Sequence, residues 1–314
     1  MEVERKSRAD DRRWQVIGAR IKGPGSRRVS GIVCCLIVIA IMHAALAGAA
    51  QDQQLATKLA MLEKIPGTFS FIVIGDNRTG DDMYAKIVSR IVERKPDFIM
   101  NTGDMIATPG SREQWAKFWE LSKPITMPYF LAVGNHDAHP KVLFSEKAYK
   151  EQVDLPGNEL YYSFVAGNSL FVVLDSYIDD QEKRITGDQL KWLTGVLEAS
   201  KQQHKFVFLH HPLYTEPGKG HHPNDSLDKY PAERDKLEAL FVKNKVDAVF
   251  AGHEHFYQRK VVDGITHVIT GGGGAPMYLK DEDGGYYHYV RVVVDKDKVS
   301  AEVVDVNGKI RDTF

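Results

Sequence analysis

Residues 69–80 read FSFIVIGDNRTG, a run of mostly apolar residues that leads directly into Gly75, Asp76, Asn77 and Arg78. The apolar run predicts a buried strand, and the residues after it place the carboxylate of Asp76 at the end of that strand. The same polar residues are common in turns, because glycine tolerates positive φ and Asp and Asn hydrogen-bond their own backbone. This stretch alone therefore leaves both a turn and a functional site open.

Beyond this stretch, apolar runs alternate with amphipathic segments along the chain. Apolar residues at helical spacing predict helices over residues 55–64, 82–95, 111–122, 186–200 and 231–244. Short apolar runs predict strands over residues 69–75, 97–103, 128–134, 160–167, 169–175, 204–211, 246–253, 261–272, 286–295 and 298–306. The early strands alternate with helices and the last are joined by short turns. This order favours a mixed α/β layered domain with parallel strands first and antiparallel strands last.

The N-terminal residues differ in composition from the rest of the chain. Residues 1–30 carry a net charge of +5, and residues 31–50 read GIVCCLIVIAIMHAALAGAA without a charged side chain. A basic flank followed by an apolar run that ends in small residues is the layout of an export signal, although the run is almost long enough to span a bilayer. We therefore expect residues 1–50 to be a cleaved signal or an anchor, residues 51–68 a linker with a short helix, and residues 69–314 the functional domain. That domain is expected in the periplasm or outside the cell, or tethered outside the cytoplasm, with membrane contact only through residues 31–50.

Charge and cysteine content exclude several classes of function. Outside the first 50 residues the net charge is -6, so no basic surface for nucleic acid is evident. Both cysteines, Cys34 and Cys35, lie in the apolar run. The predicted domain therefore has no disulfide framework, no thiolate metal site and no cysteine nucleophile.

Several predicted strands end in polar residues, as the first one does. The set comprises Asp76, Asp104, Asn135, His136, His210, His253 and His255. Each residue alone is compatible with a turn, a helix cap or a buried histidine. In open α/β sheets, however, ligands gather at the carboxyl ends of strands. Carboxylate, amide and imidazole donors without sulfur suit Mn, Fe or Zn, and a pair of such ions about 3.5–4 Å apart can clamp an in-line displacement at phosphorus.

The same residues fall into motifs that resemble a known family. In chain order the motifs are GDNR at 75–78, GD at 103–104, GNHD at 134–137, HHP at 210–212 and GHEH at 252–255. This series is similar to the motifs of the calcineurin-like metallophosphoesterases. The later GHEHFYQR and VITGGGGAP look like the purple acid phosphatase side of that superfamily. The resemblance implies a four-layer αββα sandwich of two mixed sheets flanked by helices.

The resemblance also implies roles for individual residues. Asp104 would bridge two transition metals (Mn, Fe or Zn, divalent or trivalent), and Asn135, His210 and His253 would complete the second, more certain site. Asp76 and His255 would belong to the first site.

Two further residues would act on the substrate itself. His136 would stabilise or protonate the leaving oxygen, and Asp137 would orient its ring. The nucleophile would be a hydroxide activated by the metals, which attacks the phosphate ester in line.

Two residues depart from the family pattern. Arg78 stands where the commonest form has a histidine ligand, and Ala107 stands where purple acid phosphatases have a tyrosine. The first site is therefore short of a protein ligand: it would take water or Asn77, or bind metal weakly, or belong to a domain that only binds. The planar guanidinium of Arg78 suits phosphate oxygens, and the alternative is a surface salt bridge to Asp81 or Asp82.

The remaining motifs receive less specific interpretations. Gly271–Gly274 predicts a close approach of the backbone to the metal site. His221 and His222 lie in a polar loop that is either solvated or on the substrate side. The expected function is metal-dependent hydrolysis of a phosphorylated small molecule or other phosphoester, with monoesters first. Phosphodiester or pyrophosphate hydrolysis and non-catalytic binding of a phosphate ligand or partner remain alternatives.

Overall fold

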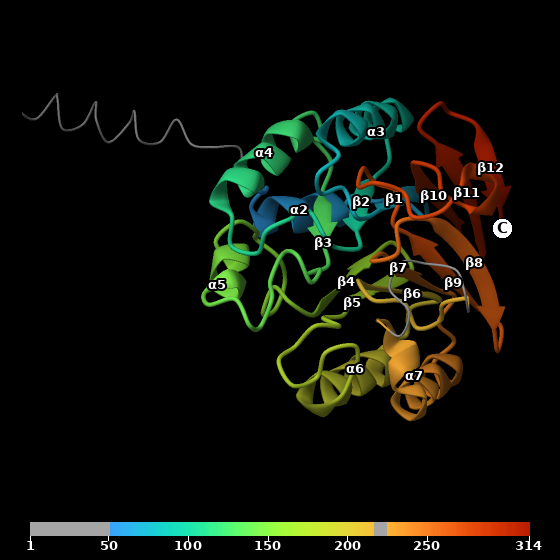
Figure 1. Ribbon diagram of the computed structural model, residues 1–314. Helices are drawn as coiled ribbons and strands as arrows, with labels where there is room; N and C mark the ends of the chain where they lie inside the picture. The colour runs from blue at the N-terminus through green and yellow to red at the C-terminus, as the bar shows by residue number, and fades with distance from the viewer. Residues whose placement is uncertain (1–50, 217–224) are drawn as a thin grey trace, which may run out of the picture. The chain divides into compact units, whose positions relative to one another are not determined.

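Two six-stranded β-sheets face each other in the computed structural model, which describes residues 51–216 and 225–314 (Figure 1). The first sheet has the order β12-β11-β10-β1-β2-β3. Its strands are β1 (Thr68–Ile74), β2 (Phe98–Asn101), β3 (Tyr129–Leu131), β10 (His288–Asp295), β11 (Lys298–Asp305) and β12 (Ile310–Thr313). The second sheet has the order β4-β5-β6-β7-β9-β8. Its strands are β4 (Tyr162–Ala166), β5 (Ser169–Val173), β6 (His204–Leu209), β7 (Ala248–Ala251), β8 (Tyr257–Val262) and β9 (Ile265–Thr270).

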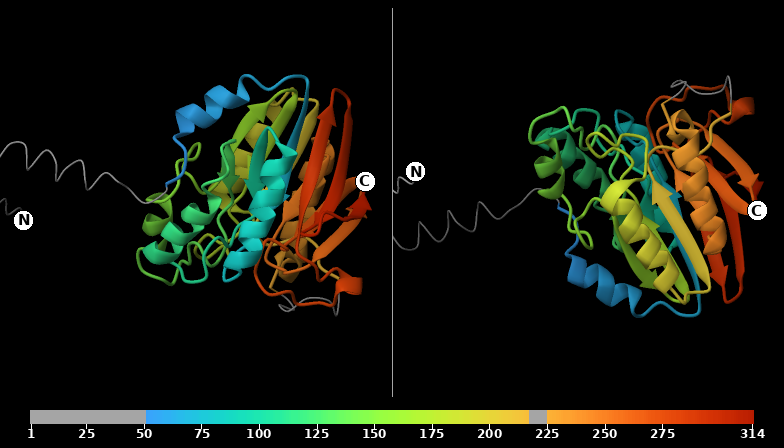
Figure 2. Two further views of the ribbon diagram at one scale, coloured as in Figure 1. Left: turned by 90° about the horizontal axis from the view of Figure 1, so that it is seen from above. Right: turned by 90° about the horizontal axis from the view of Figure 1, so that it is seen from below.

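Helices cover the outer face of each sheet, as Figures 1 and 2 show. The first sheet is covered by α3 (Asp81–Arg94) and α4 (Arg112–Ser122), and the second by α6 (Gly187–Ala199) and α7 (Pro231–Lys243). Shorter helices are α2 (Leu55–Leu62), α5 (Ser145–Lys150), η1 (Leu227–Lys229) and η2 (Asp281–Asp283). The predicted sandwich of two mixed sheets flanked by helices is confirmed.

Side-chain alternation along the strands of the second sheet builds two hydrophobic layers. In β6, Phe206 and Phe208 belong to the layer between the sheets, where the Phe206 ring lies 5.2 Å from that of Phe71. Val207 and Leu209, which point to the opposite face, pack in the layer beneath α6 and α7. Buried on both faces, the strand reads as a continuous apolar run, which is why its pattern was recognisable in the sequence.

The predicted change from parallel to antiparallel strands is confirmed in the first sheet, whereas the second sheet has an antiparallel pair at each edge, β4 with β5 and β8 with β9. Strands β1, β2 and β3 run parallel, whereas β10, β11 and β12 are joined as antiparallel neighbours. Several short elements were missed, including β12, α5, η1 and η2. Strand β12 has no buried residue, so no apolar alternation marks it, and α5 is only 6 residues long, too short for a helical pattern.

Helix α2 lies within the predicted linker and packs on the domain. Lys58 is fully buried and pairs with Asp52, and its Nζ also donates to the carbonyl oxygen of Asp154 at 3.1 Å. The predicted segment 1–50 and the histidines 221 and 222 lie outside the described residues. Within residues 51–216 and 225–314, none of the helices has the length and apolar character needed to cross a bilayer.

Candidate metal centre

The ends of strands from both sheets meet at one place. Beside β1 and β2, the backbone N–H of Asp76 donates to Gly103 O at 2.9 Å. Beside β6 and β7, the N–H of Gly252 donates to His210 O at 3.0 Å. Hydrogen bonds link the two sheets here: the backbone N–H of His253 donates to both carboxylate oxygens of Asp76, at 3.0 and 2.9 Å. The predicted convergence of strand ends is therefore the arrangement in the structure.

Four buried or half-buried side chains, the second-site residues, surround one point. They are Asp104, Asn135, His210 and His253. The Asn135 Oδ1 atom lies 2.9 Å from His210 Nε2 and 3.2 Å from His253 Nδ1, while Asp104 Oδ1 lies 3.4 Å from His210 Nε2. Carboxylate, amide and imidazole donors gathered in this way fit Mn, Fe or Zn.

Partners outside this set orient the two imidazoles. His210 Nδ1 donates to the carbonyl oxygen of Thr102 at 2.9 Å, which leaves the lone pair on Nε2 directed at the second site. Burial lowers the pKa of His210 and so favours the neutral ring that a metal ligand requires. His253 Nε2 lies 3.5 Å from Asp225 Oδ2, so its Nδ1 faces the site. A hydrogen bond from His253, together with one from Lys183, lowers the pKa of Asp225.

Basic neighbours and a backbone hydrogen bond hold Asp104 in its ionised form. Burial alone would raise the pKa of its carboxyl, but His210, His136 and Arg78 outweigh burial and lower it to about 2. The backbone N–H of His136 also donates to Asp104 Oδ1 at 3.0 Å. Asp104 is therefore a buried carboxylate at the middle of the centre and ready to bind a cation.

Glycines make room for the carboxylates. A Cβ atom on Gly134 would lie 2.3 Å from Asp104 Oδ1, and one on Gly252 would lie 2.3 Å from Asp76 Oδ2. The Gly271–Gly274 run has the predicted effect, since a Cβ on Gly271 would lie 2.2 Å from Glu254 O and 3.0 Å from Asp76 Oδ2. Any side chain at these positions would occupy the space in which the donors converge.

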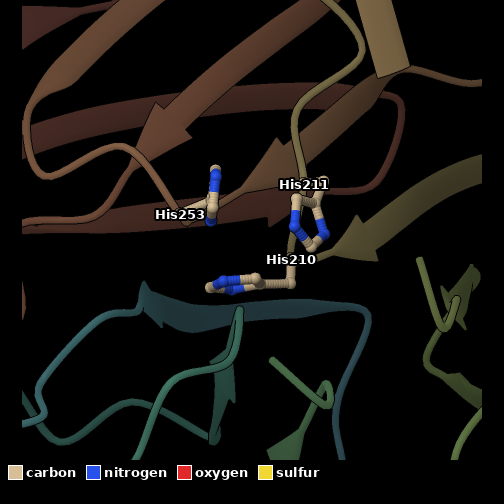
Figure 3. Close-up of side chains that lie close together, drawn as sticks. All are labelled: His210, His211 and His253. Carbon is tan, nitrogen blue, oxygen red and sulfur yellow. The ribbon is translucent and has the colours of Figure 1, made fainter. Parts of the chain in front are cut away.

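Two overlapping clusters of donors satisfy the spacing of a metal site. One joins Asp76, Asp104 and His210, and the other joins His210, His211 and His253, with donor atoms within 4.8 Å of one another in each. Figure 3 shows the three histidines together. His211 was not among the predicted ligands. Its Nδ1 lies 2.9 Å from Ser176 Oγ, and its ring centroid lies 4.3 Å from that of His253.

The first-site residues, which we define as Asp76, Asp104 and His255, have a different occupant. Arg78 Nε donates to Asp104 Oδ2 at 3.0 Å, and Arg78 Nη2 lies 3.5 Å from His255 Nε2. His255 Nε2 is also 3.6 Å from Asp76 Oδ1. The predicted alternative of a surface salt bridge from Arg78 to Asp81 or Asp82 is wrong, because the guanidinium pairs with the buried Asp104 instead.

The predicted contact between Asp137 and the ring of His136 is also wrong. The Asp137 carboxylate accepts the backbone N–H groups of Asp104, Met105 and Gly134 at 2.7, 2.8 and 2.9 Å. The His136 Nδ1 atom instead donates to the carbonyl oxygen of Ala107 at 2.6 Å. Asp137 thus fixes the loop after β2, and a backbone carbonyl orients the histidine.

Three neighbours of the centre carried no signal in the sequence. Besides Asp225 and His211, Tyr278 stacks on His255 with ring centroids 4.1 Å apart and its hydroxyl 3.3 Å from His255 Nε2. Asp225 and Tyr278 come from segments outside the motif series, and His211, although part of the HHP motif, was not distinguished there as a neighbour of the ligands. Only the folded chain brings them to the ligands.

Comparisons with known proteins find relatives of this chain among phosphatases. The chain is 27% identical over 256 residues to purple acid phosphatase 23 of Arabidopsis thaliana, covering 78% of this chain and 51% of that protein. It is 27% identical to phosphoenolpyruvate phosphatase of Allium cepa, with 69% and 49% covered. The chain thus spans about half the length of the curated relatives it matches.

Solved structures share the fold. A purple acid phosphatase from yellow lupin (Lupinus luteus) seeds superimposes with a TM-score of 0.66 at 20% identity, over 79% of this chain and 54% of that one. The family model for calcineurin-like phosphoesterases matches residues 69–257, which include every strand end of the centre. The chain therefore belongs to the calcineurin-like phosphoesterase family.

Proposed function

We propose that this protein is a metal-dependent hydrolase of phosphate monoesters. The observation that carries the proposal is the convergence of Asp104, Asn135, His210 and His253 within hydrogen-bonding distance or little more. A metal ion held there would supply Lewis acidity toward the phosphate and activate water for the attack. Relatives support the class of reaction, since one is named as a phosphatase of phosphoenolpyruvate, a monoester.

His136 would supply the proton in this proposal. Its backbone N–H contacts Asp104, so the residue is anchored beside the second-site residues. Its Nδ1 donates to Ala107 O, so Nε2 is the ring atom that remains to face a substrate. Protonated at Nε2, the ring would donate to the leaving oxygen as the phosphorus–oxygen bond breaks.

A cavity beside the centre offers space for the rest of the substrate. Its volume is about 740 Å³, and its lining includes Asn77, which follows Asp76, and Met105, which follows Asp104. Lys86 and Lys117 also line it. Asp81 and Asp82 line it as well, so the charges of the two lysines are matched by two carboxylates. The predicted contact of Arg78 with the phosphate stays a prediction.

The test is hydrolysis of an aryl phosphate by the full chain, after chelation and after addition of Mn²⁺. We expect turnover only with metal, and a higher kcat/KM for the aryl phosphate than for the corresponding diaryl phosphate. Faster cleavage of the diester would favour phosphodiester hydrolysis instead. Metal binding without turnover of either ester, or of pyrophosphate, would contradict the enzyme proposal and favour a binding domain.

The location of the protein is part of the same proposal. Residues 1–50 have the layout of an export signal, and we infer that the domain acts outside the cytoplasm. The N-terminal sequence of protein recovered outside the cytoplasm distinguishes a cleaved signal from an anchor. A first residue near position 50 supports cleavage.

A further inference from the structure

A guanidinium lies among the residues that the family uses to hold its first metal. Arg78 contacts two of the three first-site residues, with Nε 3.0 Å from Asp104 Oδ2 and Nη2 3.5 Å from His255 Nε2. Its charge also interacts with the third residue, Asp76. The cation therefore faces the same donors that would otherwise face a metal ion.

The hydrogen bond made by His255 directs the unprotonated nitrogen of its ring toward Arg78. His255 Nδ1 donates to the carbonyl oxygen of Pro276 at 2.8 Å, so the lone pair of the neutral ring is on Nε2. That lone pair is the one a metal would use. Arg78 has only donors and cannot lose its proton, so at this point it replaces a metal and does not serve as a ligand.

Asp104 divides its two oxygens between the sites. Oδ1 faces His210 Nε2 at 3.4 Å and accepts the backbone N–H of His136, whereas Oδ2 accepts Arg78 Nε. A carboxylate that bridges two metal ions must direct an oxygen lone pair at each of them. Here one side is directed at the second site and the other is paired with a protein cation.

The arginine is held in place by the fold. Its backbone N–H donates to Asp104 O at 3.1 Å, and its side chain is only 15% exposed. A largely buried guanidinium paired with a carboxylate repels a divalent cation placed at the same donors, because two positive charges close together in a poorly solvated site interact strongly. The first site therefore does not fit a metal ion.

We propose that the guanidinium of Arg78 takes the place of the first metal ion, so that the chain binds one transition metal, at the second-site residues. This inference rests on the proposed metal-dependent function and changes the number of ions from two to one. The arginine would supply a fixed positive charge toward the substrate phosphate, where the family has a second Lewis acid.

The test is the metal content of the full chain dialysed against Mn²⁺ alone, measured by elemental analysis per chain. The wild type and Arg78→Lys, which keeps the charge, are expected to hold one Mn²⁺ and to give the electron paramagnetic resonance spectrum of an isolated ion. Arg78→His restores the imidazole of the family pattern and removes the fixed charge. This variant is expected to hold two ions with a spectrum of magnetic coupling.

Arg259→His is the matched control. Arg259 also pairs with an aspartate, as its Nε lies 2.8 Å from Asp312 Oδ2, but it lies in β8 and contacts none of the first-site residues. The Arg259→His variant should hold one Mn²⁺ per chain. Two ions in the wild type would overturn this inference and leave the proposed function intact, whereas no ion in any variant would overturn both. One ion in Arg78→His would show that Arg78 does not exclude the second.

Discussion

The two halves of the metal centre use the same kinds of side chain and differ in what surrounds them. In the second site, His210 is oriented by Thr102 O and His253 by Asp225, so both rings direct a nitrogen at Asn135. In the first site, the donors of Asp104 and His255 face Arg78. The donors of the second site face one another, whereas the donors of the first site face the positively charged side chain of Arg78.

If Arg78 takes the place of the first ion, as we propose, motif residues alone do not determine how many metal ions the centre binds. The first-site carboxylates and His255 are all retained at their strand ends, yet one arginine two residues after Asp76 changes the charge at their centre. Under this proposal, the number of ions that the centre holds depends on the charge of the side chains around its donors as well as on the donors themselves. Four substitutions test the comparison, in order of decreasing effect.

The largest effect is expected from His210→Ala. Loss of this ligand removes the imidazole that both donor clusters share, so Mn²⁺ affinity should fall by more than the roughly 100-fold associated with outer contacts, and turnover should be lost. Isothermal titration with Mn²⁺ measures the affinity. The neighbouring variant His211→Ala, whose ring contacts Ser176, should keep the metal; equal losses in both variants would place the ion among the three histidines.

The next effect is expected from His136→Ala. Removal of the general acid should lower kcat by roughly 10²–10⁴ while the metal content stays at the wild-type value. Single-turnover kinetics and elemental analysis check the two parts. His139→Ala is the control, because that ring contacts Tyr177 and not the donors, and it should stay near wild-type kcat. Metal lost with His136 would assign the residue to the site itself.

A smaller effect is expected from Asp225→Asn. The amide keeps the shape but loses the charge that orients His253, so Mn²⁺ affinity should fall by about 10–100-fold. The matched control is Asp247→Asn. The Asp247 Oδ1 atom lies 3.0 Å from Nδ1 of a different histidine, His204, which is not part of the metal centre. A dissociation constant that is unchanged in Asp225→Asn would remove this residue from the second site.

The smallest effect is expected from Ala107→Tyr, which restores the tyrosine of purple acid phosphatases while Arg78 stays. If the guanidinium is what excludes the first ion, the added ligand should leave the content at one Mn²⁺ per chain. Elemental analysis gives the answer. A second ion in this variant would mean that the missing ligand, and not the charge of Arg78, limits the first site.

The fold could be predicted well where the pattern reports burial. Strands such as β6 are apolar on both faces, and helices such as α3 bury one stripe, so period and length identified them. Strand β12 was missed because none of its four residues is fully buried. Strand topology beyond parallel and antiparallel order depends on pairing between distant segments, which one sequence does not reveal.

The sequence predicted the donor residues of the site, but it did not predict the groups that orient those donors. Asp104 and His253 follow apolar runs, so their positions at predicted strand ends identified them as candidate metal ligands. The same rule could not identify Asp225, which follows no strand, or show that Ala107 O and not Asp137 orients His136. Arg78 was noticed as a departure, but only its contact with Asp104 reveals what the departure does. Contacts made by backbone carbonyls and by loops carry no residue preference that a pattern can report.

The second-site residues come from both sheets, and this has a consequence for the lifetime of the folded chain. Asp104 and Asn135 follow strands of the first sheet, while His210 and His253 follow strands of the second. An ion bound by all four would tie the two sheets to each other. A ligand that binds only the folded state at about 100 times its dissociation constant raises the free energy of unfolding by roughly 2.7 kcal/mol. Scarcity of metal would then reduce the amount of intact protein as well as its turnover.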